Sequence, residues 1–219
     1  MLIDTLLIVH IAVLGYWLGA ELIINSTYRY VAWSSSMPFA ERDRLMDHVL
    51  NVDQHVRYAL LLQITLGITL AALIGYLPGG KPLALVVAAL AVIWLGLVEI
   101  THRRRKLAEG ERLASIDRTV RYTVILVLLA LSINALNNEA AMPDWLAWKL
   151  ILFGGVIACG VAIRLTLIRF YRVWHVIEEV GFDAQCEMRI RQIYIIGTSI
   201  LGVLWLCIAG IVGLSVWKP

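Results

Sequence analysis

Six long runs of apolar residues constrain the fold of this chain more than any other feature of its sequence. They cover residues 2–25, 57–77, 82–101, 122–141, 145–168 and 191–217. A helix needs ~20 mainly apolar residues to cross the hydrocarbon core of a bilayer, whereas a transmembrane β-barrel would show ~10-residue segments of alternating hydrophobicity. The runs therefore predict an all-α integral membrane protein, in which a six-transmembrane-helix bundle forms a single domain over residues 1–219.

The amino-acid composition agrees with a membrane protein. Hydrophobic residues make up 60% of the chain and charged residues 16%. Soluble domains are ~45–50% apolar and ~25% charged, and a soluble core cannot bury so large an apolar excess. The composition excludes a soluble enzyme, a disordered chain and a nucleic-acid-binding protein, so the lipid bilayer is the first partner that we expect.

The lysines and arginines predict the orientation of the chain. All but three of the 19 lie in or beside the segments that follow the first, third and fifth runs, and the exceptions are Lys81, Lys149 and Lys218. Loops rich in Lys and Arg stay in the cytoplasm. We expect a multi-pass protein of a bacterial-type inner membrane with both termini periplasmic. Residues 38–56 and 170–190 are amphipathic, which predicts cytoplasmic helices that lie at the interface or extend the spans inward.

Polar side chains follow one face of the first apolar run. The stripe has three- and four-residue steps and consists of His10, Leu14, Trp17, Glu21, Asn25 and Tyr28. Such a stripe lies on one face of a helix and must face protein rather than lipid. His10 is ~12 Å along the helix from Leu2, in the outer half of the bilayer. Titratable groups at such depths are usually functional. A ligand or redox role for His10 and a structural hydrogen bond are the two interpretations.

The fifth run carries a lysine at a similar level. Lys149 lies ~7 Å along the helix from Asp144, in the same outer layer as His10. A cation inside hydrocarbon is costly, which favours a function for Lys149. The alternative is that its long side chain reaches back to the membrane surface.

A second group of titratable residues lies at the cytoplasmic ends of the spans. Glu99 and His102 form a Glu-x-x-His pair, which places a carboxylate and an imidazole on one helix face. Di-iron carboxylate bundles use the same spacing. Ion pairing with neighbouring arginines is the alternative. The residues that would make a metal site at this face are Glu21, His55, Glu99, His102 and His175.

Several segments resemble the HemJ-type protoporphyrinogen oxidases and the related CopD-type membrane domains. These segments are residues 6–22 (LLIVHIAVLGYWLGAEL), residues 57–77, residues 145–150 (WLAWKL) followed by Arg164-Leu165, and the chain end Val216-Trp217-Lys218-Pro219. The third and fourth runs would be an insertion relative to a short HemJ-type protein. The sequence departs from the family's pattern at Ala147, where a histidine is usual, and at residues 194–198, which replace Asn-Glu-Pro-Thr.

The resemblance implies a haem-b-associated oxidoreductase that exchanges electrons with a quinone-level acceptor. It implies that His10 is an axial ligand of the haem iron and that Lys149 is the second ligand or pairs with a haem propionate. Trp17 would lie beside the cofactor. Arg164 and Arg169 would bind anionic head groups or substrate carboxylates near the inner face, since guanidinium groups suit carboxylate and phosphate. A quinone or a porphyrin-like molecule is the expected hydrophobic substrate.

Two other functions remain open at this point. One is a non-haem, di-iron-like metal enzyme that uses the cytoplasmic-face residues named above. The other is a non-catalytic membrane anchor or assembly subunit of a larger respiratory or transport complex, or a homo-oligomer, in which the polar stripe faces a partner helix.

Overall fold

The chain folds into six long α-helices. The computed structural model describes residues 1–105, 107–138, 142–181 and 183–218, and in these ranges there is no β-strand. The helices are α1 (Leu2–Trp33), α2 (Phe39–Ile74), α3 (Gly80–Arg103), α4 (Ala108–Asn137), α5 (Asp144–Val180) and α6 (Ala184–Trp217). Each is long and apolar enough to cross a membrane. The prediction of an all-α, multi-pass membrane protein is confirmed.

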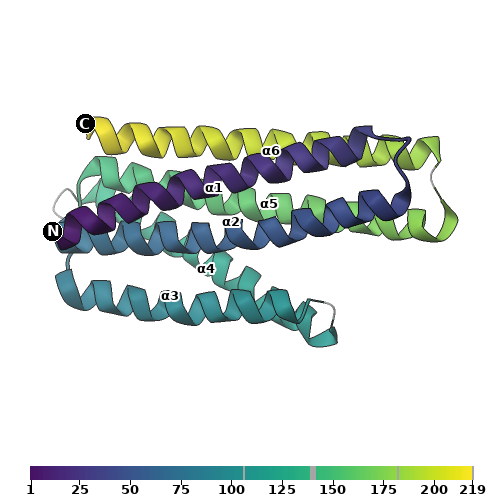
Figure 1. Cartoon of the computed structure of the whole chain (residues 1–219). Helices are drawn as coiled ribbons and strands as arrows, with labels where there is room; N and C mark the ends of the chain where they lie inside the picture. Colours follow the sequence, from purple (N-terminus) through teal and green to yellow (C-terminus); the bar gives the residue numbers. More distant parts are fainter. Residues whose placement is uncertain (106, 139–141, 182, 219) are drawn as a thin grey trace.

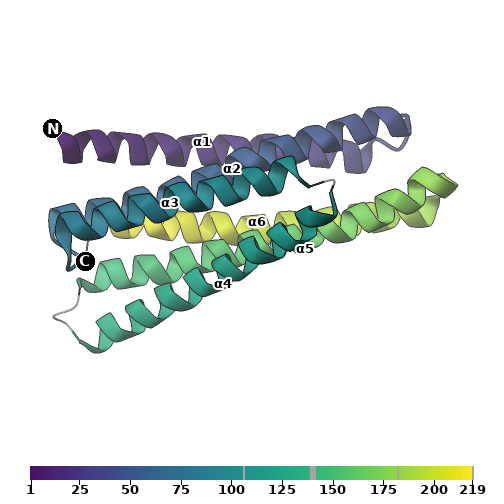
Figure 2. The same cartoon turned by 90° about the horizontal axis from the view of Figure 1, so that it is seen from below.

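Consecutive helices pack side by side. Helix α1 packs on α2 and α6, α2 packs on α3, and α4 packs on α3 and α5, which in turn packs on α6. The chain runs up and down, so both termini lie at one end of the bundle (Figure 1). We call this end the termini end. Figure 2 shows α3 beside α2 and α4 beside α5.

Four helices extend beyond the other two at the opposite end. At 1.5 Å per residue, the 36 residues of α2 and the 37 of α5 span ~54–56 Å, against ~36 Å for the 24 residues of α3. The ends of α1, α2, α5 and α6 therefore project past the turn between α3 and α4 (Figure 1). We call this part, approximately residues 25–52 and 166–197, the protrusion.

The two amphipathic segments belong to the protrusion. Residues 39–56 are the first part of α2, which continues without a break into the span. Residues 170–190 contain the end of α5, a turn at Gly181 with φ of 91°, and the start of α6. Of the two expected arrangements, the segments extend the spans and do not form separate interfacial helices. The predicted span 122–141 begins inside α4, and residues 139–141 lie outside the described residues.

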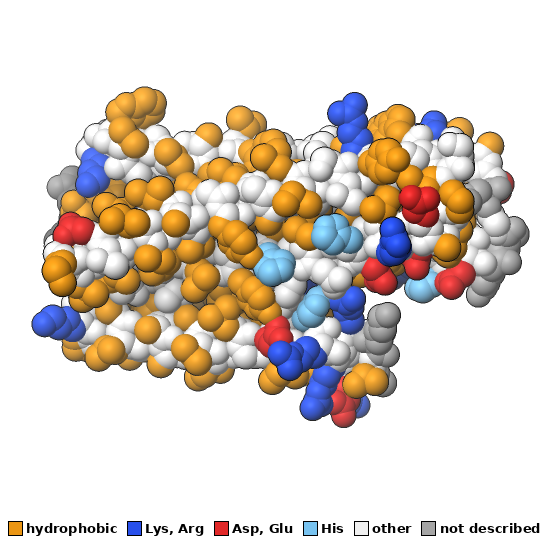
Figure 3. All heavy atoms as spheres, in the orientation of Figure 1, with side chains coloured by type: hydrophobic (Ala, Val, Ile, Leu, Met, Phe, Trp, Pro, Cys, Tyr) orange, Lys and Arg blue, Asp and Glu red, His pale blue; other side chains and the backbone are white. Residues whose placement is uncertain are grey.

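The protrusion has a packed core of its own. Tyr28, Met46, Phe170 and Trp174 are buried there, and the Phe170 and Trp174 rings stack with centroids 5.0 Å apart. The guanidinium of Arg42, fully buried, pairs with Glu187 at 2.5 Å. On the face seen in Figure 3, apolar side chains cover most of the termini half, while histidine and most charged side chains lie in the other half, over the α3–α4 turn and the protrusion.

Candidate functional site

His10 is a partly buried titratable residue in the termini half of the bundle, and α2 contacts it on two consecutive turns. The Gln63 amide Nε2 donates to the His10 carbonyl oxygen at 3.1 Å. One turn further, a Cβ added at Gly67 would lie 3.6 Å from His10 Cε1. The imidazole therefore rests on the α2 backbone. Its Nδ1 atom is buried and has no hydrogen-bond partner in the part of the chain that the structure describes.

Lys149 and two further buried polar atoms lie in the same half of the bundle. Lys149 is partly buried on α5, close enough for its charge to act on the His10 ring. Gln63 Oε1 and Trp205 Nε1 are buried without a hydrogen-bond partner among the described residues. A buried polar atom that lacks a partner costs ~1–3 kcal/mol. Three such atoms, on α1, α2 and α6, make the termini half of the bundle a candidate site for a ligand.

Trp17 lies about two turns along α1 from His10 and is committed to other contacts. The side chain is 2% exposed in the core shared with Ala59 and Leu204. Its indole Nε1 donates to Glu21 Oε1 at 3.2 Å. The structure thus places Trp17 with Glu21 and does not show it against the His10 ring.

A network of charged residues joins α2, α4 and α5 further from the termini end. Asp53 accepts from Arg57 Nε at 3.0 Å and from Arg164 on α5 at 3.3 Å. On α4, Asp117 accepts from Arg121 Nε at 2.9 Å. We call these five residues the arginine network. Arg164 also lies within electrostatic range of Asp117 and Arg121, so the two halves form one charged layer.

Two further helices contribute to this layer. Trp94 on α3 donates from Nε1 to Asp117 at 2.9 Å, and the Arg121 guanidinium lies over its ring at 5.8 Å. Glu21 on α1 is 6% exposed and interacts electrostatically with Asp53. Five of the six helices thus meet at this level.

Only one member of this network is among the site residues predicted from the sequence. Arg164 was expected to bind anions near the inner face, and it lies in the network. Asp53 and Asp117 were missed. A detectable signal is the repeated Asp-x-x-x-Arg spacing of residues 53–57 and 117–121 inside apolar helices, because residues four apart lie on one helix face.

The side chains proposed for a non-haem metal site have separate partners. His55 Nδ1 and the Tyr16 hydroxyl lie 2.5 Å apart, and Glu99 accepts from Tyr58 and from Arg103. His102 contacts Arg105, whereas His175 lies on the protrusion 3.4 Å from Glu178. Among the residues that the structure describes, no group of three His, Cys, Asp or Glu side chains could hold a metal ion.

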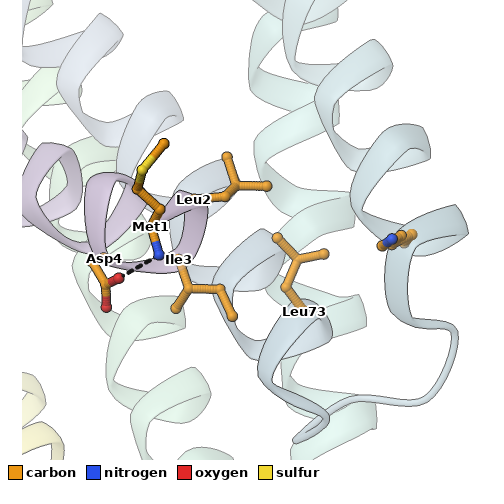
Figure 4. A pocket seen from close by; sticks show the side chains of 6 residues that line it. Met1, Leu2, Ile3, Asp4 and Leu73 are labelled. Carbon is orange, nitrogen blue, oxygen red and sulfur yellow. Dashed lines mark ion pairs between the residues drawn. The ribbon is translucent and has the colours of Figure 1, made fainter.

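An open pocket of ≈ 420 Å³ lies at the termini end between α1, α2 and α3. Its lining is Met1, Leu2, Ile3, Asp4, Leu73 and Lys81. Figure 4 shows Asp4 turned toward the Met1 amino group, which it pairs with at 2.7 Å. Mainly apolar side chains line the rest, and His10 is not among them. The pocket therefore contributes no chemistry to the His10 region.

Comparisons with protein-family models, with curated proteins and with solved structures found no match to this chain. The functional argument therefore depends on the residues and their geometry.

Proposed function

We propose that this chain is a membrane oxidoreductase that binds haem b in the termini half of its bundle, with His10 as a ligand of the iron. The observation that carries the proposal is the buried Nδ1 atom of His10, which has no hydrogen-bond partner among the described residues. Neutral imidazole is the commonest protein ligand of haem iron. Haem b would supply a one-electron redox centre, and the resemblance to HemJ-type and CopD-type proteins supports this assignment.

The residues around His10 have distinct roles in this proposal. The Gln63 amide fixes the α1 backbone at His10, and Gly67 leaves room for the imidazole. Lys149 lies near enough to the ring for its charge to act on it. As an ammonium it would pair with a propionate carboxylate, whereas only its neutral amine, which has a free lone pair, would be a second iron ligand. A hydrophobic quinone or porphyrin-like molecule would reach this region from the lipid and exchange electrons there.

The test is a spectrum of the purified protein. A reduced-minus-oxidised difference spectrum should show a b-type haem in the unchanged protein and none in His10→Ala. The matched control is His175→Ala, because His175 is exposed on the protrusion and should keep the full spectrum. If His10→Ala inserts normally and retains the spectrum of the unchanged protein, His10 is not the ligand.

We also propose that the termini end faces the periplasm of a bacterial-type inner membrane. The supporting observation is the charge distribution, because the protrusion and the α3–α4 turn carry most lysines and arginines, and such loops stay in the cytoplasm. A topology reporter fused at Glu109 should be located in the cytoplasm, and the same reporter fused at the C-terminus should be located in the periplasm. The opposite pattern would reverse the orientation.

A further inference from the structure

We propose that the arginine network binds the phosphate headgroup of an anionic phospholipid from the leaflet on the protrusion side. This site is separate from the His10 region and does not depend on the presence of haem. The argument rests on the level of the network in the bilayer, on the hydrogen-bond donors that it leaves available, and on the access that Arg164 provides.

The network lies at the level of lipid headgroups. Arg57 is 17 residues from Ile74, Arg121 is 16 from Asn137, and Arg164 is 20 from Asp144. At 1.5 Å per residue these guanidinium groups lie ~24–30 Å from the termini end of their helices. The hydrocarbon core is ~30 Å thick. The three arginines therefore reach the boundary where the phosphates of the other leaflet begin, and basic pockets between helices at this level are typical headgroup sites.

The network has more donors than it uses. Arg57 and Arg121 each contact their aspartate through Nε, and Arg164 contacts Asp53 through one terminal nitrogen. A guanidinium carries five N–H donors. Strong arginine–carboxylate pairs are usually bidentate, whereas each of these three arginines makes a single contact with its aspartate in the part of the chain that the structure describes. The remaining terminal N–H groups suit the oxygens of a phosphate.

The network carries little net charge, so a phosphate would bind it through hydrogen bonds from the guanidinium N–H groups more than through net positive charge. Three arginines face Asp53 and Asp117, and Glu21 adds a third carboxyl group near Asp53. The layer is therefore close to neutral when all three carboxyl groups are ionised, and so it is tolerated at the edge of the hydrocarbon core. A phosphate would bind through directed hydrogen bonds from guanidinium groups that the aspartates and Trp94 hold in place.

Arg164 is the point of access. Its side chain is 36% exposed, whereas those of Arg57 and Arg121 are 13% and 11% exposed. The more buried arginines position the site, and Arg164 presents its free N–H groups to the surrounding lipid.

The test compares thermal unfolding of the purified protein in two bilayers. One contains phosphatidylcholine alone, and the other an equimolar mixture of phosphatidylcholine and phosphatidylglycerol at the same ionic strength. The anionic lipid should raise the Tm of the unchanged protein, and Arg164→Gln should lose most of this rise. Arg172→Gln is the matched control, since Arg172 is an exposed arginine further along the same helix, and it should keep the rise.

Two further measurements make the result decisive. Arg164→Lys keeps the positive charge but loses the planar fork, so it should show a smaller rise than the unchanged protein even if Arg164→Gln does not fold. Inorganic phosphate in detergent tests a free anion, and stabilisation by it with no further gain from phosphatidylglycerol would overturn the lipid assignment. An equal phosphatidylglycerol effect in the unchanged protein and all Arg164 variants would show that the network is only a structural ion-pair layer and overturn the proposal.

Discussion

The imidazole of His10 on α1 lies against the backbone of Gly67 on α2, where an added Cβ would be 3.6 Å from Cε1. Four residues earlier on α2, Gln63 donates to the carbonyl oxygen of His10. Two turns of α2 therefore set both the position of the α1 backbone and the direction of the ring. The side chain at position 67 decides whether the ring can keep that direction.

Substitutions at Gly67 test whether the direction of the His10 ring determines haem binding. Gly67→Ala places a methyl group at ordinary van der Waals distance and should leave haem content unchanged. Gly67→Val adds branched methyl groups, and overpacking of this kind costs ~1–3 kcal/mol, so the ring should turn and haem content should fall several-fold. The measurement is haem per protein after purification. A Gly67→Val protein with normal haem content would show that the ring direction is unimportant.

Substitutions of Lys149 and of the Glu99–His102 pair distinguish the two predicted sites, the haem site in the termini half and the non-haem metal site at the other end of the spans. A cation at the centre of the hydrocarbon core costs ~2.5–3.5 kcal/mol, and one near its edge costs less. Because such a cost favours a functional role for Lys149, Lys149→Met should lower haem content or activity. Glu99→Gln should change little, since the Glu99–Arg103 pair is exposed and such pairs are worth ~0–1 kcal/mol. His102→Gln should also change little, since the imidazole is only part-buried beside Arg105 and glutamine can still form a hydrogen bond there.

Metal content and activity of these three variants should be measured at matched expression. An unchanged Lys149→Met protein together with loss of a bound metal from Glu99→Gln would move the functional site to the protrusion side of the membrane.

The sequence predicts the number and order of the helices but not where they end. An apolar run marks only the part of a helix that contacts lipid. Helix α2 begins at Phe39, before the apolar run that starts at Arg57, because its first residues are amphipathic and pack in the protrusion. His10 could be found from sequence because it interrupts an apolar run. The partnership of Asp53 with Arg164 could not, since it joins residues 111 positions apart and arises only when α2 and α5 pack together.

Removal of one partner of the Arg42–Glu187 ion pair should destabilise the protrusion. Arg42 is fully buried, and Glu187 is 13% exposed. Removal of one partner from a buried pair costs ~3–5 kcal/mol, because the other charge stays buried. We therefore expect Glu187→Ala to lower the free energy of unfolding by about 3 kcal/mol, the lower end of that range.

The control for this change is Glu178→Ala. Glu178 pairs with His175 at 3.4 Å, but both side chains are exposed, so the expected change is ~0–1 kcal/mol. Unfolding in detergent, followed by tryptophan fluorescence, measures both variants, since Trp174 lies beside Arg42. Equal effects of the two substitutions would show that the Arg42 pair adds nothing beyond a surface contact.

The turn between α5 and α6 should respond to pH through Asp183. Asp183 caps α6 by accepting a hydrogen bond from the backbone N–H of Cys186 at 2.6 Å, and this bond lowers the pKa of the Asp183 carboxyl. A carboxyl whose folded-state pKa is depressed stabilises the fold above its unfolded pKa of ~3.9 and loses that contribution as the pH falls through the folded value.

Asp183→Ala should therefore lower Tm near neutral pH, and the Tm difference between this variant and the unchanged protein should shrink in acid. Asp183→Ser, which can cap the helix without titrating, should restore part of the Tm and differ less with pH. A difference between Asp183→Ala and the unchanged protein that stays constant down to strongly acidic pH would contradict the assigned cap.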